Sequence, residues 1–334
     1  METKNIIFLL ILASSFGFFA YSVRRLIRHL QIGQAENRFD NPLVRLKKVW
    51  VIAFGQTKLL REPLAGVMHF VIFWGFVVLL TAVLESIGEG VVSDFSLTWV
   101  LNANVYESLA FLQDLFAGLV IISVLFALFR RYVLRPKRLE VDLHGKIDAA
   151  AILFAIMLIM VSMLGQNATR MVQQDPELAF ARFVSGMMMP MFDHSSAPVW
   201  FEIFWWIHIV LVLGFLNYLP YSKHLHVLTS IPNVYFSSLN PRGALKSLNL
   251  EAENVEKFGA SDVQDLTWKQ LLDGYTCTEC GRCTEACPAN ITGKLLSPKK
   301  IIVDIRRRMQ EKGPLVFDGG GVSVAEGQNN PAEK

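Results

Sequence analysis

The sequence predicts an all-α membrane protein, a bundle of five transmembrane helices followed by a small helical domain. Composition is the first observation, because 52% of the 334 residues are hydrophobic and the mean hydropathy is +0.37, more apolar than an ordinary soluble domain. The second is that apolar residues come in five long runs, each near the ~20 residues that cross hydrocarbon as a helix. The runs cover residues 6–23, 63–87, 105–129, 147–165 and 200–221.

The first run is the shortest, and a cleaved signal peptide is the competing interpretation of it. Only Lys4 precedes the apolar stretch, and no small-residue cleavage site follows it. Arg24, Arg25 and Arg28 come directly after the run, as basic residues do after a stop-transfer segment. We therefore expect a transmembrane helix here.

Loop charge sets the expected orientation of the bundle. Residues 24–62 hold nine Lys or Arg and residues 130–146 hold six, whereas residues 88–104 hold none and residues 166–199 hold two. Loops rich in Lys and Arg stay on the cytoplasmic side, so we expect the amino terminus outside and everything after residue 221 in the cytoplasm. The net charge of +3 follows from this bias, and no nucleic-acid surface is predicted.

The strongest motif is a run that holds all four cysteines. It reads Cys277-Thr-Glu-Cys280-Gly-Arg-Cys283-Thr-Glu-Ala-Cys287-Pro288, which is the C-x2-C-x2-C-x3-C-P spacing of bacterial iron–sulfur proteins. Gly281 lets the backbone turn, and Pro288 is expected to keep the loop from becoming a helix. A zinc knot or a disulfide pair is the alternative, but zinc sites favour two separated C-x2-C pairs and disulfide scaffolds scatter their cysteines. We predict a [4Fe–4S] cluster on Cys277, Cys280, Cys283 and Cys287.

A single run leaves the role of Cys287 open. In two-cluster ferredoxins the fourth cysteine of such a run serves the other cluster, and this sequence has no second run. Either Cys287 closes one cluster locally, or a partner supplies cysteines, or the sequence is the front part of a longer polypeptide. Residues 318–334 are rich in Gly and Asn without a hydrophobic period, which predicts a linker or a disordered tail and favours the longer polypeptide.

Histidines inside the apolar runs predict a second cofactor. His69 lies in the second run and His208 in the fifth, and ionisable residues inside a membrane are functional candidates. Two imidazoles from facing helices are the usual way in which a helical bundle holds a b-type haem. A packed polar side chain is the commoner role of a lone intramembrane histidine.

Depth and helical phase favour His69 together with His226. If the fifth helix continues past residue 221, His226 lies five turns after His208 on the same face, while His224 faces about 160° away. His69 follows the cytoplasmic start of its helix and lies about 9 Å deep, near the level expected for His226. We predict one haem near the cytoplasmic face on this pair.

A second haem on His208 has no evident second ligand. Leu79 stands ten residues after His69, where another histidine of that helix would lie, and His194 lies in an outer loop.

Both motif regions resemble known families. His69 in its helix, followed by WIHIVLVLGFLNYLPYSKHLHVLTSIPNVY, resembles the five-helix cytochrome b (gamma) subunit of respiratory nitrate reductase. The cysteine run, followed by SPKKIIVDIRRRM, resembles the ferredoxin segment of membrane-bound iron–sulfur oxidoreductases related to heterodisulfide reductase. Chains that join the two parts resemble the ETF:menaquinone oxidoreductase type, and the likeness covers nearly all of residues 1–317. Members of that type usually continue into a second cysteine run and cysteine-rich CCG modules.

The resemblance implies a bacterial inner-membrane protein that passes electrons between a cytoplasmic donor and menaquinone. The implied donor is electron-transfer flavoprotein or another dehydrogenase. The implied domains are a cytochrome b-like transmembrane domain over residues 1–230, a cytoplasmic α-helical ferredoxin-type [4Fe–4S] domain over 231–317, and a tail over 318–334. The alternative function is a non-catalytic membrane anchor that docks a soluble, heterodisulfide reductase-like oxidoreductase.

Quinone chemistry needs groups that exchange protons. Glu85, Glu107 and Asp114 lie in or near the second and third runs and are candidates for this role. A helix cap or an interfacial position is the simpler assignment for Glu85 and Glu107.

Overall fold

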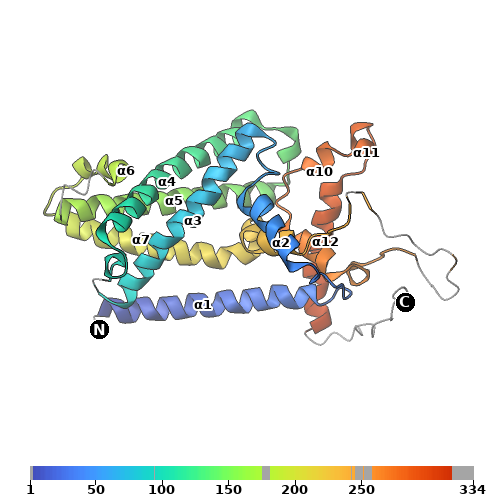
Figure 1. The fold of residues 1–334 in the computed structure, drawn as a ribbon, viewed down its shortest axis with the longest axis horizontal. Coiled ribbons are helices and arrows are strands. Elements are labelled where there is room, and N and C mark those ends of the chain that lie inside the picture. Colours follow the sequence, from blue (N-terminus) through green and yellow to red (C-terminus); the bar gives the residue numbers. More distant parts are fainter. Residues whose placement is uncertain are drawn as a thin grey trace. The chain divides into compact units, whose positions relative to one another are not determined.

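The computed structural model describes residues 3–93, 95–174, 181–241, 243–244, 251 and 258–317. The described residues form helices and connecting turns, with no strand among them (Figure 1). One isolated bridge pairs Gln34 with Thr267. The predicted tail, residues 318–334, lies outside the described residues.

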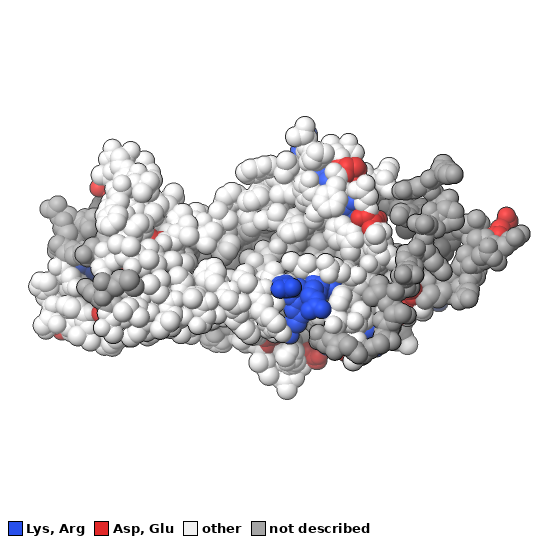
Figure 2. Space-filling model, turned by 90° about the horizontal axis from the view of Figure 1, so that it is seen from below, with Lys and Arg blue, Asp and Glu red and all other residues white. Residues whose placement is uncertain are grey.

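All five predicted runs form helices long and apolar enough to cross a membrane. This confirms the predicted helical membrane architecture, because a bilayer demands continuous apolar helices of this length. Figure 2 shows a broad surface almost without charged side chains, with one group of Lys and Arg along it. The five helices are α1 (Thr3–Leu30), α3 (Pro63–Val91), α4 (Ala103–Phe129), α5 (Leu143–Gln174) and α7 (Ala197–Tyr218).

The chain divides into two compact units. The helical-bundle unit comprises Met1–Ala20 and Gln56–Leu219, and the cysteine-loop unit comprises Tyr21–Gly55 and Pro220–Lys334. The predicted domain boundary between residues 230 and 231 falls inside a helix, α8 (His226–Tyr235).

In the helical-bundle unit, α4 packs between α3 and α5, and α5 packs along α7. The close approach of α3 to α4 depends on Gly75, because a Cβ there would lie 2.5 Å from Val120. A second core joins the first turns of α1 to α7 through Phe8 and Trp205. The main core between α3, α4 and α5 consists of Leu79, Ala117, Val120, Val124, Ile159, Met160, Met163 and Leu164.

The cysteine-loop unit is built from two segments far apart in the sequence. The last turns of α1 and the short α2 (Pro42–Lys48) join α8, α9 (Trp268–Thr276) and α12 (Pro298–Phe317). Segment 24–61 therefore contains helical structure. The core of this unit consists of Leu26, Ile32, Leu225, Val263, Leu271, Tyr275 and Met309.

The predicted continuation of the fifth helix through His226 is wrong. Helix α7 ends at Tyr218, and two short 3-10 turns, Leu219–Tyr221 and Lys223–Leu225, precede α8. Pro220 ends the helix because it has no backbone N–H to donate and its ring clashes with the preceding turn. The Ser222 hydroxyl then accepts from the His224 backbone N–H and starts a new direction.

Candidate functional site

The four cysteines lie on a loop and two short helices between α9 and α12. A capping box of Thr267 and Gln270 starts α9, which delivers the chain to Cys277 at its end. The loop then turns through two residues in the left-handed region, Glu279 with φ 58° and Gly281 with φ 74°. The predicted turn at Gly281 is therefore present.

Pro288 does not act as predicted. It begins a short helix, α11 (Pro288–Ile291), directly after α10 (Arg282–Glu285) and the last cysteine. Proline is well accommodated at the first position of a helix, where its missing N–H would have no partner in the helix.

The donor set on this loop fits an iron–sulfur cluster. All four thiols are free, with Cys277 and Cys287 partly buried and Cys280 and Cys283 exposed. The described residues hold no group of three His, Cys, Asp or Glu placed around a single metal ion. A cluster distributes four thiolates over separate irons, so it does not require the sulfurs to converge on one atom.

Three residues, Glu279, Lys223 and Arg306, form a charged frame that holds the start of the cysteine loop. Glu279 pairs with Arg306 of α12 and, at 3.4 Å, with the Lys223 ammonium. Arg306 also donates to the Cys277 carbonyl at 2.9 Å. Burial disfavours ionised Glu279, yet the charges of Lys223 and Arg306 hold its pKa below the usual range. Burial also raises the pKa of the Cys277 thiol.

The two histidines predicted to share a haem lie in different units. His69, near the start of α3, donates from Nδ1 to the Gln56 amide oxygen at 3.0 Å. His226, the first residue of α8, donates from Nδ1 to the Lys223 carbonyl at 3.1 Å. Metal-ligating histidines commonly bind a protein oxygen in this way through the ring nitrogen that does not face the metal.

The environment of His226 keeps its ring neutral. Burial lowers the pKa of His226, although the hydrogen bond to the Lys223 carbonyl works against that shift. Neutral imidazole is the form that ligates a metal.

His224 does not point away from His226 as helical phase predicted. The two rings lie 5.0 Å apart, nearly perpendicular to one another. A separation of about 160° requires an unbroken helix, and residues 223–225 form a 3-10 turn instead.

His208 is buried between α7 and α5. Its Nδ1 lies 3.2 Å from the Ile159 carbonyl and 3.1 Å from the Ser162 hydroxyl. Its Nε2 is buried without a hydrogen-bond partner among the described residues, as a ligand nitrogen would be. Leu79 is a packed core residue and His194 is exposed, so neither supplies a second ligand there.

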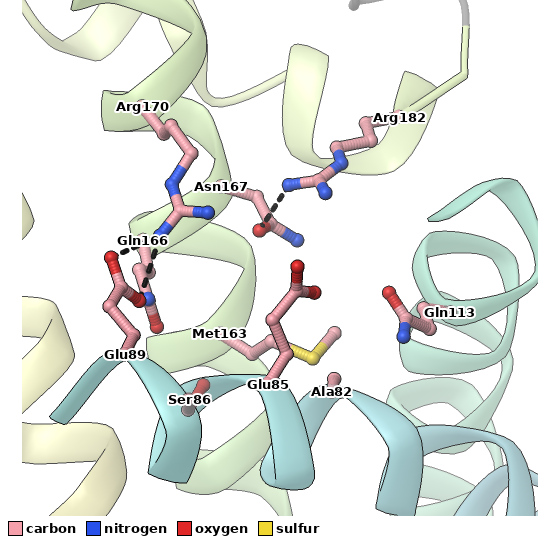
Figure 3. Close-up of a pocket in the computed structure, with 10 residues that line it drawn as sticks. All are labelled: Ala82, Glu85, Ser86, Glu89, Gln113, Met163, Gln166, Asn167, Arg170 and Arg182. Atoms are coloured by element: carbon pink, nitrogen blue, oxygen red, sulfur yellow. Dashed lines mark hydrogen bonds and ion pairs between the residues drawn. The ribbon is translucent and has the colours of Figure 1, made fainter. Parts of the chain in front are cut away.

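The sequence singled out Glu85 but not the small pocket around it in the helical-bundle unit, whose cavity volume is about 20 Å³. Figure 3 shows the Glu85 carboxylate directed between Arg182, Asn167 and Gln113. The sequence did carry a signal for this pocket. Arg170 and Arg182 are the two Lys or Arg residues in the stretch 166–199. The pocket is lined by Ala82, Glu85, Ser86, Glu89, Gln113, Met163, Gln166, Asn167, Arg170 and Arg182.

The charges in this pocket balance. Glu89 pairs with Arg170 at 2.8 Å, and Arg182 donates to Asn167 at 2.6 Å and to the Tyr106 hydroxyl at 3.2 Å. One oxygen of Glu85 accepts from Ser96 and from the Leu97 backbone N–H, both at 3.0 Å. The lining therefore carries two carboxylates and two guanidinium groups. All ten lining residues lie on or beside α3, α4, α5 and α6 (Phe183–Gly186).

The other two acidic candidates lie outside the pocket. Asp114 accepts from the backbone N–H groups of Val184 at 2.6 Å and Ser185 at 3.1 Å, which holds α6 against α4. Glu107 is exposed in the second turn of α4.

Three curated proteins are similar to this chain. It is 33% identical over 314 residues to the "probable iron-sulfur-binding oxidoreductase FadF" of Bacillus subtilis, an alignment that covers 93% of this chain and 44% of the relative. It is 31% identical over 303 residues to "EtfAB:quinone oxidoreductase" of Syntrophomonas wolfei, covering 87% and 42%. Over 61 residues it is 41% identical to a "probable membrane-anchored ferredoxin" of Chromohalobacter salexigens, covering 18% and 9%.

The chain spans less than half the length of the curated relatives it matches. No protein-family model matches it, and no solved structure matches it. The names of the relatives bear out the predicted class of an iron–sulfur oxidoreductase or an electron-transfer subunit of one, whereas they carry no support for the cytochrome b likeness or for haem. The homologues of this chain are thus iron–sulfur-binding and quinone-linked oxidoreductases.

Proposed function

We propose that this chain is a membrane electron-transfer protein that carries electrons between a cytoplasmic donor and menaquinone. The observation that carries the proposal is the presence, in one chain, of a four-thiol loop and five long apolar helices. The name of one relative, EtfAB:quinone oxidoreductase, supports electron-transfer flavoprotein as the donor and quinone as the acceptor. Loop charge favours a cytoplasmic cysteine loop, within reach of a soluble donor.

The chain's own residues have distinct tasks in this function. A [4Fe–4S] cluster on the four cysteines and a b-type haem on His69 and His226 would each accept and release single electrons when bound. The thiols hold the cluster as thiolates, and Arg306 fixes the loop through the Cys277 carbonyl. Hydrogen bonds at Nδ1 fix the orientation of both imidazole rings.

Rapid mixing tests the electron path. In the anaerobically prepared chain, reducing the cysteine-loop centre should be followed by an absorbance change of reduced haem, and added menaquinone analogue should then reverse that change. Cys280→Ser should abolish the first step. Zinc in place of iron after anaerobic preparation, or a chain without haem absorbance, would contradict the proposal.

A second candidate function, to which only the membrane anchorage in the name of one relative points, is an anchor on which the cluster stabilises a docking domain. The same mixing experiment separates the two. An anchor would show haem reduction by the cytoplasmic donor at an unchanged rate in Cys280→Ser, because the cluster would lie off the electron path.

We further propose that the polar groups at the mouth of the Glu85 pocket contact the quinone head group. Buried carboxylates are costly in a membrane bundle and mark functional sites. The lining holds equal numbers of carboxylates and guanidinium groups, which favours a neutral polar ligand over an ion. A ligand that enters a bundle of apolar helices from the lipid is lipid-soluble. A quinol combines these properties and can donate a hydroxyl hydrogen bond to Glu85.

Several polar groups in the pocket are available to such a ligand. Among the described residues, the second oxygen of Glu85 and the side-chain amide of Gln166 have no hydrogen-bond partner, and Gln113 uses only its nitrogen, on Thr81 at 3.0 Å. A dihydroxy ring offers donors and acceptors at opposite ends, which matches acceptors on α3 and α4 and amide and guanidinium donors on α5 and beside α6.

Binding of a fluorescent hydroxyquinoline N-oxide, a quinol analogue, tests the location. Gln166→Leu removes no hydrogen bond within the described residues, so it should fold normally and still weaken binding about tenfold, the cost of one hydrogen bond to a buried polar group. Glu85→Gln should weaken it as well. Glu107→Gln, an exposed acid on α4, is the matched control. Unchanged affinity in both pocket variants would place the quinone elsewhere.

A further inference from the structure

The charged frame of the cysteine loop reaches one of the proposed haem ligands. Lys223 makes the connection, because its carbonyl accepts from His226 Nδ1 at 3.1 Å while its ammonium lies 3.4 Å from Glu279. Glu279 stands between Cys277 and Cys280 in the sequence. A continuous series of polar contacts thus runs from the imidazole to the cysteine loop, entirely within the cysteine-loop unit.

Burial strengthens the ion pairs in this series of contacts. The side chains of Lys223, Glu279 and Arg306 are only 10%, 13% and 15% exposed. Water competes little for such pairs, and removing one partner leaves another charge buried without compensation. Arg306 adds a second attachment through the Cys277 carbonyl. The Glu279 backbone lies in the left-handed region, with φ 58°, and its side chain is held by both Lys223 and Arg306.

We propose that Lys223, Glu279 and Arg306 form a bridge that couples the cluster to His226. They are positioning residues. They hold the turn that carries His226 in a fixed position beside the cysteine loop, and they set the reduction potentials of the cluster and of the haem. This inference rests on the proposed function, because it takes the cluster to lie on Cys277 and a haem on His226.

The charges of the bridge fix the direction of its effects. Two cations and one anion leave a surplus positive charge beside the loop, and reduction of a cluster adds a negative charge there. Removing the anion should therefore favour reduction, and removing a cation should oppose it. Glu279→Gln and Lys223→Met should shift the potential in opposite directions, whereas simple loosening of the loop would shift both the same way.

A redox titration of the full anaerobic chain measures these shifts, with electron paramagnetic resonance for the cluster and absorbance for the haem. Glu279→Gln should raise the reduced-to-oxidised ratio of the cluster about tenfold at a fixed ambient potential, which is 59 mV for a one-electron couple. Lys223→Met should lower it comparably, and Lys223→Arg should restore it. The haem should follow in the same directions by smaller amounts. Asp304→Asn, which removes an exposed acid of α12, is the control.

Shifts of the same sign in Glu279→Gln and Lys223→Met, or an unmoved haem potential in both, would overturn the bridge. A second readout does not depend on the cofactors. In the metal-free chain, backbone amides of residues 223–226 should exchange hydrogen faster in Glu279→Gln than in the wild type or Asp304→Asn. A wild type that binds no iron would refute the proposed function alone, and equal exchange rates would refute the bridge.

Discussion

At the scale of single residues, the cysteine spacing predicted the most. It identified the loop and the turn at Gly281, because the steric demands of a tight loop are local. It gave no indication that Lys223 and Arg306, both distant from Glu279 in the sequence, pair with it. Basic residues are common on cytoplasmic segments, so which of them pair with one acid depends on tertiary packing.

Gly281→Ala should impair the loop. Its φ of 74° lies in the left-handed region, where a Cβ costs roughly 1–2 kcal/mol. We expect less iron and sulfide per chain after anaerobic reconstitution. Gly274→Ala is the matched control, since a Cβ there makes only an ordinary contact with Arg306 at 3.6 Å. Equal iron content in the two variants would contradict the prediction.

The haem prediction is also a matter of single side chains. His69→Ala and His226→Ala should each abolish the same b-type absorbance, because each removes one of the two axial nitrogens. The reduced-minus-oxidised spectrum of purified protein measures this, with the exposed His194→Ala as control. A full haem signal in His226→Ala would refute the pairing, and loss of the signal in His208→Ala would point to another site.

At the scale of elements, hydropathy located the helices but not where the fifth one ends. The apolar run and Pro220 were both visible in the sequence, and proline near a membrane boundary is compatible with either a kink or an end. The structure ends α7 at Tyr218. Helical phase does not extend beyond that residue, so neither the shared face of His208 and His226 nor the opposed orientation of His224 follows from it.

The packing of α12 against α1 is close at Gly313. A Cβ there would lie 2.5 Å from the His29 ring, which is held by the Tyr275 hydroxyl at 2.9 Å and so has little freedom to move aside. Gly313→Ala should destabilise the cysteine-loop unit by about 1–3 kcal/mol, the cost of an overpacked core. Thermal unfolding measures this. Gly214→Ala, where a Cβ meets nothing within 4 Å, should change little.

Asp262 ties the start of a 3-10 turn to α12 through Arg308 at 3.0 Å and Lys312 at 2.7 Å. Arg308 above all, with Lys312, holds the pKa of Asp262 below its ordinary 3.8. A lowered carboxyl pKa stabilises the fold fully above the unfolded-state pKa, and this contribution is lost as the pH falls through the folded-state pKa. Asp262→Asn should therefore lower the free energy of unfolding at pH 7 by under about 1 kcal/mol, because the pairs are partly solvated, and by less at pH 2. A difference that persists undiminished at pH 2 would assign another cause.

At the scale of the whole molecule, the sequence predicted the five apolar helices and two domains, but not that residues 21–55 belong to the cysteine-loop unit. A bilayer imposes a length and a polarity on every crossing helix, and both are legible in the sequence. The association of Tyr21–Gly55 with Pro220–Lys334 is a long-range contact that no local pattern encodes.

Orientation is testable with the native cysteines, since all four lie in one run. In the metal-free protein, a membrane-impermeant thiol reagent should label inverted vesicles and leave right-side-out vesicles unlabelled, as loop charge predicts. A chain with its four cysteines replaced by serine and carrying His194→Cys should show the opposite pattern. Labelling of the native loop in right-side-out vesicles would invert the topology.

The assembly of the cysteine-loop unit has a consequence for the order of biosynthesis. Residues 21–55 leave the ribosome early, but their packing partners in α8, α9 and α12 are made only after the four later apolar helices. The early segment therefore lacks these packing partners through most of translation, because contacts so distant in sequence form last. The cysteine-loop unit is therefore complete only after all five apolar helices have been synthesised.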